Sequence, residues 1–153
     1  IHSGVNLLML FDTWGGILDL PSYKEFSLKY MDKIISQVRA QTGSNIPIIM
    51  FTKGGGLYLS EQASISPDGI GLDWTMDIGL ARKKINPDIC LQGNLDPCIL
   101  FADNSKIQQE VDNIFTKLSG KYDSNFIFNL GHGILPDINP DKVKFLIDCV
   151  HKY

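Results

Sequence analysis

Short apolar runs and longer amphipathic runs alternate along the whole chain. The five largely apolar runs have the length of strands and span Val5–Phe11, Ile46–Thr52, Gly69–Trp74, Ile89–Gly93 and Phe126–Leu130. None of them shows the strict alternation of apolar and polar positions that marks a strand with one solvated face. Continuous apolar character is typical of parallel strands that are covered on both faces.

Each of these predicted strands is followed by a segment with the 3.6-residue spacing of a helix. The predicted helices are Pro21–Gln41, Leu57–Ile65, Met76–Ile85, Asn104–Leu118 and Pro140–His151. Asp19 or Ser22 is placed to cap the first helix, and Asn139 is placed to cap the last. Five strands that each precede a helix predict an α/β fold with a parallel sheet.

Every predicted strand ends in a polar or glycine-rich segment. These segments are Phe11–Gly16, Thr52–Gly56, Gly71–Thr75, Gln92–Pro97 and Asn129–Gly133. In a parallel barrel the carboxyl ends of the strands share one rim, and the loops at that rim build the active site. We therefore expect the five segments to meet.

Several residues in these segments have a structural interpretation beside a functional one. Asp12 and Asp73 are either site residues or caps of the next helix, since aspartate is a favoured N-cap. Asp96, with the proline after it, is interpreted as a turn and helix start. Trp14 and Trp74 are interpreted as packing residues.

Two residues in these segments are candidates for binding a ligand. His132 lies between two glycines directly after a buried strand, which favours a role in the site over a structural role. Lys53 follows the second strand, where it either neutralises an acidic ligand or lays its stem along apolar surface.

Composition limits the classes of protein that the chain can belong to. The chain has 153 residues, 44% of them hydrophobic, with a net charge of −3. That charge gives no footprint for nucleic acid, and no run approaches the ~20 apolar residues of a membrane span. The three cysteines form no CxxC pair, so we expect a reducing, cytoplasmic setting without a disulfide framework. Because the chain starts at Ile1 and is shorter than the ~250 residues of a full barrel, we expect a fragment.

At the strand ends the sequence resembles the uroporphyrinogen decarboxylase family. The stretches that carry the resemblance are FDTWGG, FTKGGG, GLDWT, LQGNLDP and FNLGHGILPD, in the order and spacing of the family. The likeness extends over the whole chain and is strongest to the bacterial branch. It implies a (β/α)8 TIM barrel, of which residues 1–153 would supply about the last five βα units of a single barrel domain.

The resemblance also implies a function. Members of the family remove the four acetate carboxylates of uroporphyrinogen III to give coproporphyrinogen III in haem biosynthesis. They act as homodimers and need no metal and no organic cofactor. Carried over residue by residue, Thr13 matches the hydroxyl that contacts substrate, His132 the histidine that binds a carboxylate, and Phe11 an apolar wall. The family's catalytic residues belong to an amino-terminal half that has no counterpart here.

Two other interpretations remain open at this point. A zinc-dependent methyltransferase of the same barrel superfamily would need His and Cys ligands, but the corresponding strand ends in Thr52-Lys53-Gly54. A truncated, non-catalytic relic is the other. The half barrel would leave two open sheet edges and an uncovered inner face, so we expect the isolated chain to be inactive and either molten or prone to aggregate.

Overall fold

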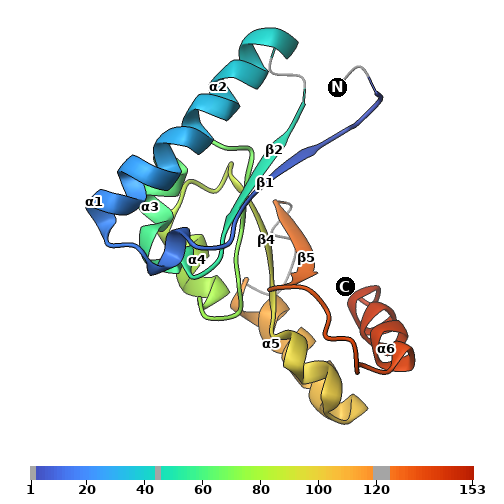
Figure 1. Ribbon diagram of the computed structural model, residues 1–153. Helices are drawn as coiled ribbons and strands as arrows, with labels where there is room; N and C mark the ends of the chain where they lie inside the picture. Colours follow the sequence, from blue (N-terminus) through green and yellow to red (C-terminus); the bar gives the residue numbers. More distant parts are fainter. Residues whose placement is uncertain (1–2, 44–45, 119–124) are drawn as a thin grey trace.

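The computed structural model describes residues 3–43, 46–118 and 125–153, in which strands and helices alternate (Figure 1). The strands are β1 (Leu8–Asp12), β2 (Ile48–Thr52), β3 (Gly69–Gly71), β4 (Cys90–Leu95) and β5 (Phe126–Leu130). The α-helices are α1 (Leu20–Tyr23), α2 (Lys29–Thr42), α3 (Leu59–Ser64), α4 (Ile78–Lys84), α5 (Asn104–Lys117) and α6 (Pro140–Val150). Shorter helical segments are η1 (Gly15–Ile17), η2 (Lys24–Leu28), η3 (Gly55–Tyr58) and η4 (Pro97–Phe101).

The strands form one sheet in chain order, β1-β2-β3-β4-β5. Each neighbouring pair is parallel, so all of the strands run the same way. A parallel sheet whose strands follow the order of the chain, with a helix after each strand, is the arrangement of a (β/α) barrel. The prediction of a parallel α/β fold is confirmed.

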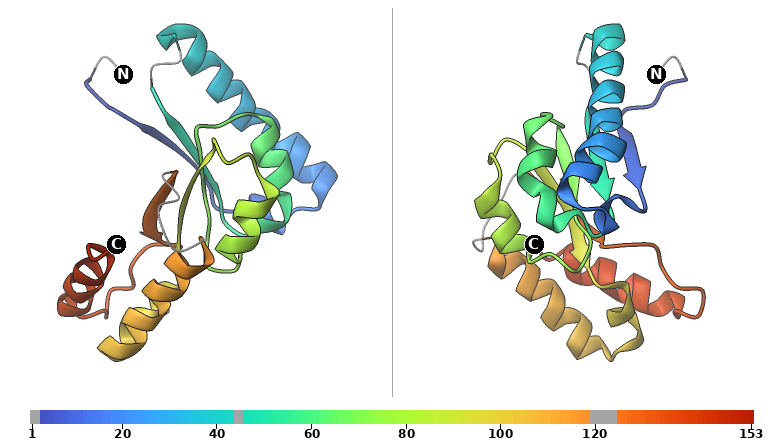
Figure 2. Two further views of the ribbon diagram at one scale, coloured as in Figure 1. Left: turned by 180° about the vertical axis from the view of Figure 1, so that it is seen from behind. Right: turned by 60° about the vertical axis from the view of Figure 1, so that its left-hand side comes forward.

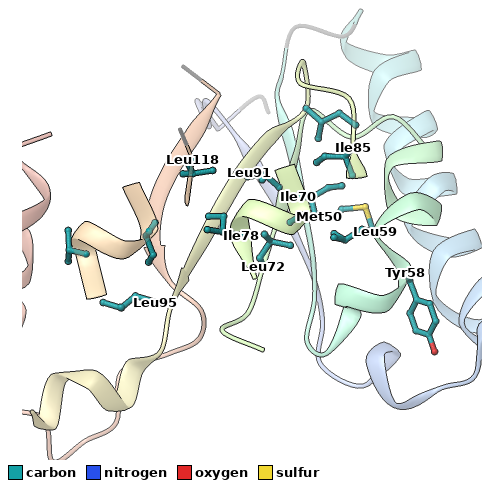
Figure 3. Close-up of a cluster of buried hydrophobic side chains, with 14 of the residues drawn as sticks. Met50, Tyr58, Leu59, Ile70, Leu72, Ile78, Ile85, Leu91, Leu95 and Leu118 are labelled. Carbon is teal, nitrogen blue, oxygen red and sulfur yellow. The ribbon is translucent and has the colours of Figure 1, made fainter. Parts of the chain in front are cut away.

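The hydrophobic core lies between the sheet and its helices. Met50, Ile70 and Leu91 come from three successive strands and are all completely buried. Figure 3 shows them beside Leu59 of α3 and Ile78 of α4 in one cluster. Complete burial of a side chain of this size stabilises a fold by roughly 1.5–3 kcal/mol. This cluster therefore holds the helices on one face of the sheet (Figure 2).

The opposite face of the sheet is the inside of the barrel, and it is open at both ends of the sheet. Phe11 on β1 is 69% exposed and Ile127 on β5 is 41% exposed. Within the described residues, β1 pairs only with β2, and β5 pairs only with β4. The structure is thus part of a barrel, as predicted, with two open edges and an incompletely covered inner face.

The predicted elements differ from the observed ones mainly at their ends. The predicted helix Pro21–Gln41 is one helical run, α1-η2-α2, in which η2 is a π-helical segment. Asp19 caps it by accepting the N–H of Ser22 at 2.9 Å. The predicted strand Gly69–Trp74 already ends at Gly71, because the chain turns where the Asp73 carboxylate accepts backbone N–H groups.

Among the helices that the structure describes, none combines the length and the apolar character needed to cross a membrane.

Candidate functional site

A cavity opens on the inner face of the sheet, at the carboxyl ends of the strands. Its volume is about 310 Å³. We call it the mouth cavity; its lining residues are Met9, Phe11, Phe51, Gly71, Leu72, Gln92, Asn129, Leu130, Gly131, His132, Gly133 and Ile134. They come from all five strands or the loops after them, so the cavity lies where the strand-end segments were expected to meet.

The register of the strands explains why these residues share one face. Phe11 is paired with Phe51, Phe51 with Gly71, and Gly71 with Gln92. Gln92 is in turn paired with Ile127 on β5. Registered partners in a sheet point to the same side, so this row forms a continuous strip across the inside of the barrel. Phe11 and Phe51 make an apolar wall, with ring centroids 6.0 Å apart.

His132 reaches this wall from the far end of the sheet. It follows β5, yet its ring stacks on that of Phe51 in β2, with centroids 6.3 Å apart and an angle of 14° between the planes. The centroid of the Trp74 ring is also 6.3 Å from that of His132, with an angle of 36° between the planes. Strands β2 and β5 are separated by two others, so this contact requires the sheet to curve. The curvature brings Phe11 and His132 into one cavity.

The loop after β1 is ordered around the carboxylate of Asp12. One oxygen accepts the N–H groups of Trp14 at 3.0 Å and of Gly15 at 2.8 Å. The other accepts the hydroxyl of Ser27 in η2. Asp12 therefore shapes the loop that carries Thr13. It is not the cap of the next helix, because η1 has Trp14 as its N-cap residue and α1 has Asp19, so the capping interpretation made from the sequence is wrong for Asp12.

The carboxylate of Asp73 connects two loops, those after β2 and β3, by accepting hydrogen bonds from both. Its side chain is almost completely buried and accepts the Gly54 N–H from the loop after β2. It also accepts the N–H of Thr75 at 2.9 Å and the hydroxyl of Thr75 at 2.5 Å. Asn94 on β4 then donates its side-chain amide to the carbonyls of Asp73 and Met76, at 2.9 and 2.5 Å. The loops after β2 and β3 and the end of β4 are thus tied together.

Two glycines allow the strand-end loops to touch. A Cβ atom on Gly16 would lie 2.0 Å from the carbonyl oxygen of Lys53, so the loops after β1 and β2 could not cross with any larger residue there. A Cβ atom on Gly131 would lie 2.6 Å from the backbone nitrogen of Trp74. Gly131 also donates its N–H to the Leu95 carbonyl at 2.7 Å. Its size lets His132 approach the loop after β3.

A buried tyrosine contacts the carboxyl end of β2 from the helix side of the sheet. The Tyr23 hydroxyl shares a hydrogen bond of 3.2 Å with the Thr52 hydroxyl at the end of β2. Its ring stacks on Tyr58 with centroids 4.5 Å apart. Burial raises the pKa of Tyr23 above its ordinary value, so the hydroxyl stays protonated and available for hydrogen bonding at neutral pH.

The remaining residues that the sequence singled out also lie at the carboxyl ends of the strands but do not line the mouth cavity. Thr13 is exposed in the loop after β1, and Lys53 is half-buried after β2. Their proposed contacts with a ligand remain predictions. The interpretation of the tryptophans as packing residues is wrong for Trp14, which is 70% exposed. Trp74 is partly exposed and contacts His132.

Sequence reasoning missed three residues that the structure places at the site. Trp74 and Phe51 flank His132, and Gln92 contributes a polar side chain to an otherwise apolar strip. A polar residue inside the apolar run of β4 was the available signal for Gln92. Within the described ranges, no three His, Cys, Asp or Glu side chains converge in a way that could hold a metal ion.

Comparisons with known proteins agree with this architecture. A solved structure of a methyltransferase from Methanosarcina mazei matches 99% of this chain and 43% of its own chain, with a TM-score of 0.79. At 20% sequence identity, this likeness concerns the fold alone. The neighbour supports a partial barrel and carries no argument about the reaction.

Sequence comparisons are more specific. The family model for uroporphyrinogen decarboxylase (URO-D) matches residues 1–153. Curated uroporphyrinogen decarboxylases from Ruthia magnifica and Nitrosococcus oceani are 47% and 44% identical, over 100% and 99% of this chain. The chain spans 44% and 42% of their lengths. The chain therefore belongs to the uroporphyrinogen decarboxylase family.

Proposed function

We propose that the complete protein decarboxylates the four acetate side chains of uroporphyrinogen III to yield coproporphyrinogen III. The observation that carries the proposal is the match of the family model to all of residues 1–153. In this proposal the chain supplies the last five βα units of one barrel domain, and the remaining units come from the part of the relatives that the chain does not span. The likeness to a methyltransferase concerns the fold, so no methyl transfer is proposed.

The mouth cavity suits one part of this task, which is to hold a large substrate that is apolar in its ring and charged at its edge. Phe11 and Phe51 offer an apolar wall to a pyrrole ring. His132 presents an imidazole beside that wall, and an imidazole N–H is a suitable donor to a carboxylate. If the imidazole is protonated, the hydrogen bond is charge-assisted and stronger.

In each decarboxylation the pyrrole ring first gains a proton, and the bond between the acetate methylene and its carboxylate then breaks and CO2 leaves. The protonated ring accepts the electron pair; a proton then adds to the methylene carbon and the ring gives up the proton that it had gained. Because the ring holds the electron pair, the proposal requires no metal or organic cofactor. The protein contributes position and electrostatic stabilisation. We place the groups that handle the protons in the part of the barrel outside these residues.

The same proposal covers the setting of the enzyme. It would work in the cytoplasm as a homodimer, with uroporphyrinogen III as its substrate and without nucleic acid or membrane partners. Thr13 would contact the substrate through its hydroxyl, and Lys53 would lie near the acidic edge of the ligand. Both residues are at the carboxyl ends of the strands that build the mouth cavity.

The test is to supply the full-length protein with uroporphyrinogen III under anaerobic conditions and to identify the products after oxidation to porphyrins. Coproporphyrin as the end product is expected, and unchanged uroporphyrin would refute the proposal. Thr13→Ser and Thr13→Val form a matched pair, because the first keeps the hydroxyl and the second keeps the branched shape but replaces the hydroxyl by a methyl group. We expect the serine variant to retain activity and the valine variant to lose it; equal activities would limit Thr13 to packing.

The 153-residue chain expressed alone provides a second test. Its exposed Phe11 and Ile127 and its two open sheet edges predict a molten or aggregating chain without activity. Gel filtration together with near-ultraviolet circular dichroism measures this directly. A sharp monomer with fixed aromatic signals would contradict the prediction.

A further inference from the structure

Two side-chain amides in the mouth cavity have no partner in the part of the chain that the structure describes. Gln92 on β4 and Asn129 on β5 both line the cavity. Gln92 is registered with Ile127, two residues before Asn129, so both amides belong to the inner face of adjacent strands. No hydrogen bond joins either amide to another described residue.

Asn94 shows how the same barrel uses an amide for a structural purpose. It is registered with Asn129 across β4 and β5. Its side chain is buried and donates to the carbonyls of Asp73 and Met76, so its hydrogen-bonding capacity is used within the protein. Gln92 and Asn129 lie next to it in the sheet and leave theirs unused.

Gln92 is half-buried and Asn129 is exposed, so water can complete their hydrogen bonds while the cavity is open; a ligand that covers the cavity must replace that water with acceptors of its own. Around Gln92 and Asn129, the other cavity residues are apolar side chains or glycines, with the single exception of His132. Three side chains that can donate N–H groups therefore face one cavity, and no carboxylate is present there to accept from them. The lining suits a ligand that brings its own acceptors.

We propose that Gln92 and Asn129 form a carboxylate-binding subsite inside the barrel, deeper than the loop that carries His132. This inference rests on the proposed function, since it assigns these amides to one carboxylate of the porphyrinogen. Each amide donates one N–H to the carboxylate, and the ring of the substrate lies on the wall formed by Phe11 and Phe51. Gln92 and Asn129 are thus binding residues that position the substrate.

The carboxylate has two possible sources on the substrate. It belongs either to an acetate that the reaction removes or to a propionate that the product keeps. The product, coproporphyrinogen III, retains only the propionates. Inhibition by added product therefore distinguishes the two, because variants that lose an acetate contact keep the product affinity of the parent and variants that lose a propionate contact do not.

The variants are Gln92→Met and Asn129→Leu, which remove the amides and nearly preserve volume, each made in the full-length protein. Gln37→Met is the matched control, because Gln37 is exposed on α2 and does not line the cavity. We expect KM for uroporphyrinogen III to rise about tenfold in each cavity variant, equivalent to about 1.4 kcal/mol, with a smaller change in kcat. The control should retain the parent values. Gln92→Glu, which brings a negative charge toward the carboxylate, should raise KM further.

Unchanged KM in both cavity variants would overturn the subsite. So would a lowered thermal midpoint without a change in KM, because the amides would then be binding another part of the protein. Binding of oxidised uroporphyrin III, followed by fluorescence quenching, separates the two proposals. A parent that binds this porphyrin more tightly than Gln92→Met, but releases no CO2, supports the subsite and refutes the decarboxylase. If the parent and Gln92→Met bind the porphyrin equally and the parent is fully active, the decarboxylase is supported and the subsite is refuted.

Discussion

Removing the carboxylate of Asp73 should destabilise the protein more than its position in a loop suggests. Asp73 is 4% exposed and accepts hydrogen bonds from the Gly54 N–H, the Thr75 N–H and the Thr75 hydroxyl. Hydrogen bonds to a charged group contribute about 1.5–3 kcal/mol each. Thr75 is exposed, so water can replace the carboxylate as its hydrogen-bond partner. Gly54 is half-buried, so water would replace its partner only poorly.

The expected cost of Asp73→Ala is therefore about 3 kcal/mol, mostly from the link to Gly54. Asp96→Ala is the matched control. Asp96 directly follows β4, and its side chain caps η4 by accepting the Cys98 N–H at 2.8 Å. Loss of such a cap costs about 1 kcal/mol. Asp73→Asn, which keeps one acceptor oxygen, should fall between the two.

Urea unfolding of the full-length parent and variants, followed by circular dichroism, measures the differences in the free energy of unfolding. An ordinary domain is stable by about 5–15 kcal/mol, so a loss of 3 kcal/mol is easily resolved. If Asp73→Ala cost no more than Asp96→Ala, the carboxylate would not connect the loops after β2 and β3, and the description of this edge as a tied set of loops would be wrong.

Three further predictions concern the same edge and the helix layer. Gly131→Ala should lower the thermal midpoint and the activity together, because its Cβ would lie 2.6 Å from the nitrogen of Trp74; a silent substitution would refute the close approach. His132→Ala should reduce turnover more than stability, measured by steady-state kinetics and thermal unfolding, and unchanged turnover would remove it from the site. The pKa of Asp77 is lowered by its hydrogen bond to Lys117 and by its cap on the following helix. Because the pKa is lowered, the Asp77 carboxylate stabilises the folded state at pH values above the ordinary value of 3.8. Asp77→Asn should therefore lower the free energy of unfolding in urea, by about 1 kcal/mol at most for this partly exposed pair. This loss should shrink as the pH falls below 3.8. A deficit that stays constant with pH would contradict this.

Much of the fold could be predicted because the signals are local. The alternation of apolar and amphipathic runs located every strand, and β5 was predicted with its observed bounds, Phe126–Leu130. Asn139 caps α6 as expected, by accepting the Asp141 N–H. Strand β3 was predicted too long, because hydrophobicity extends to Leu72 whereas the chain turns at Asp73. The Asp73 carboxylate in that turn also accepts the N–H of Gly54, which is distant in the sequence.

The candidate site was predicted only in part, because only some of its signals are local in the sequence. Residues at strand ends could be identified from the sequence, and Phe11 and His132 do share a cavity. The sequence offered no way to tell that Thr13 would be turned to solvent while Phe51 and Trp74 contact His132. These contacts join residues from different loops, and they depend on how the loops cross.

The sequence by itself determined the order of the elements, the parallel direction of the strands and the polar character of their carboxyl ends, since periodicity and capping act over a few residues. Only the tertiary structure decided which polar side chains serve the protein and which face the cavity. Asn94 and Gln92 lie two residues apart in one strand. The Asn94 amide donates to two backbone carbonyls, whereas the Gln92 amide faces the cavity. The loop after β3 makes that choice, because it brings the carbonyls of Asp73 and Met76 to Asn94 from a part of the chain that is distant in sequence.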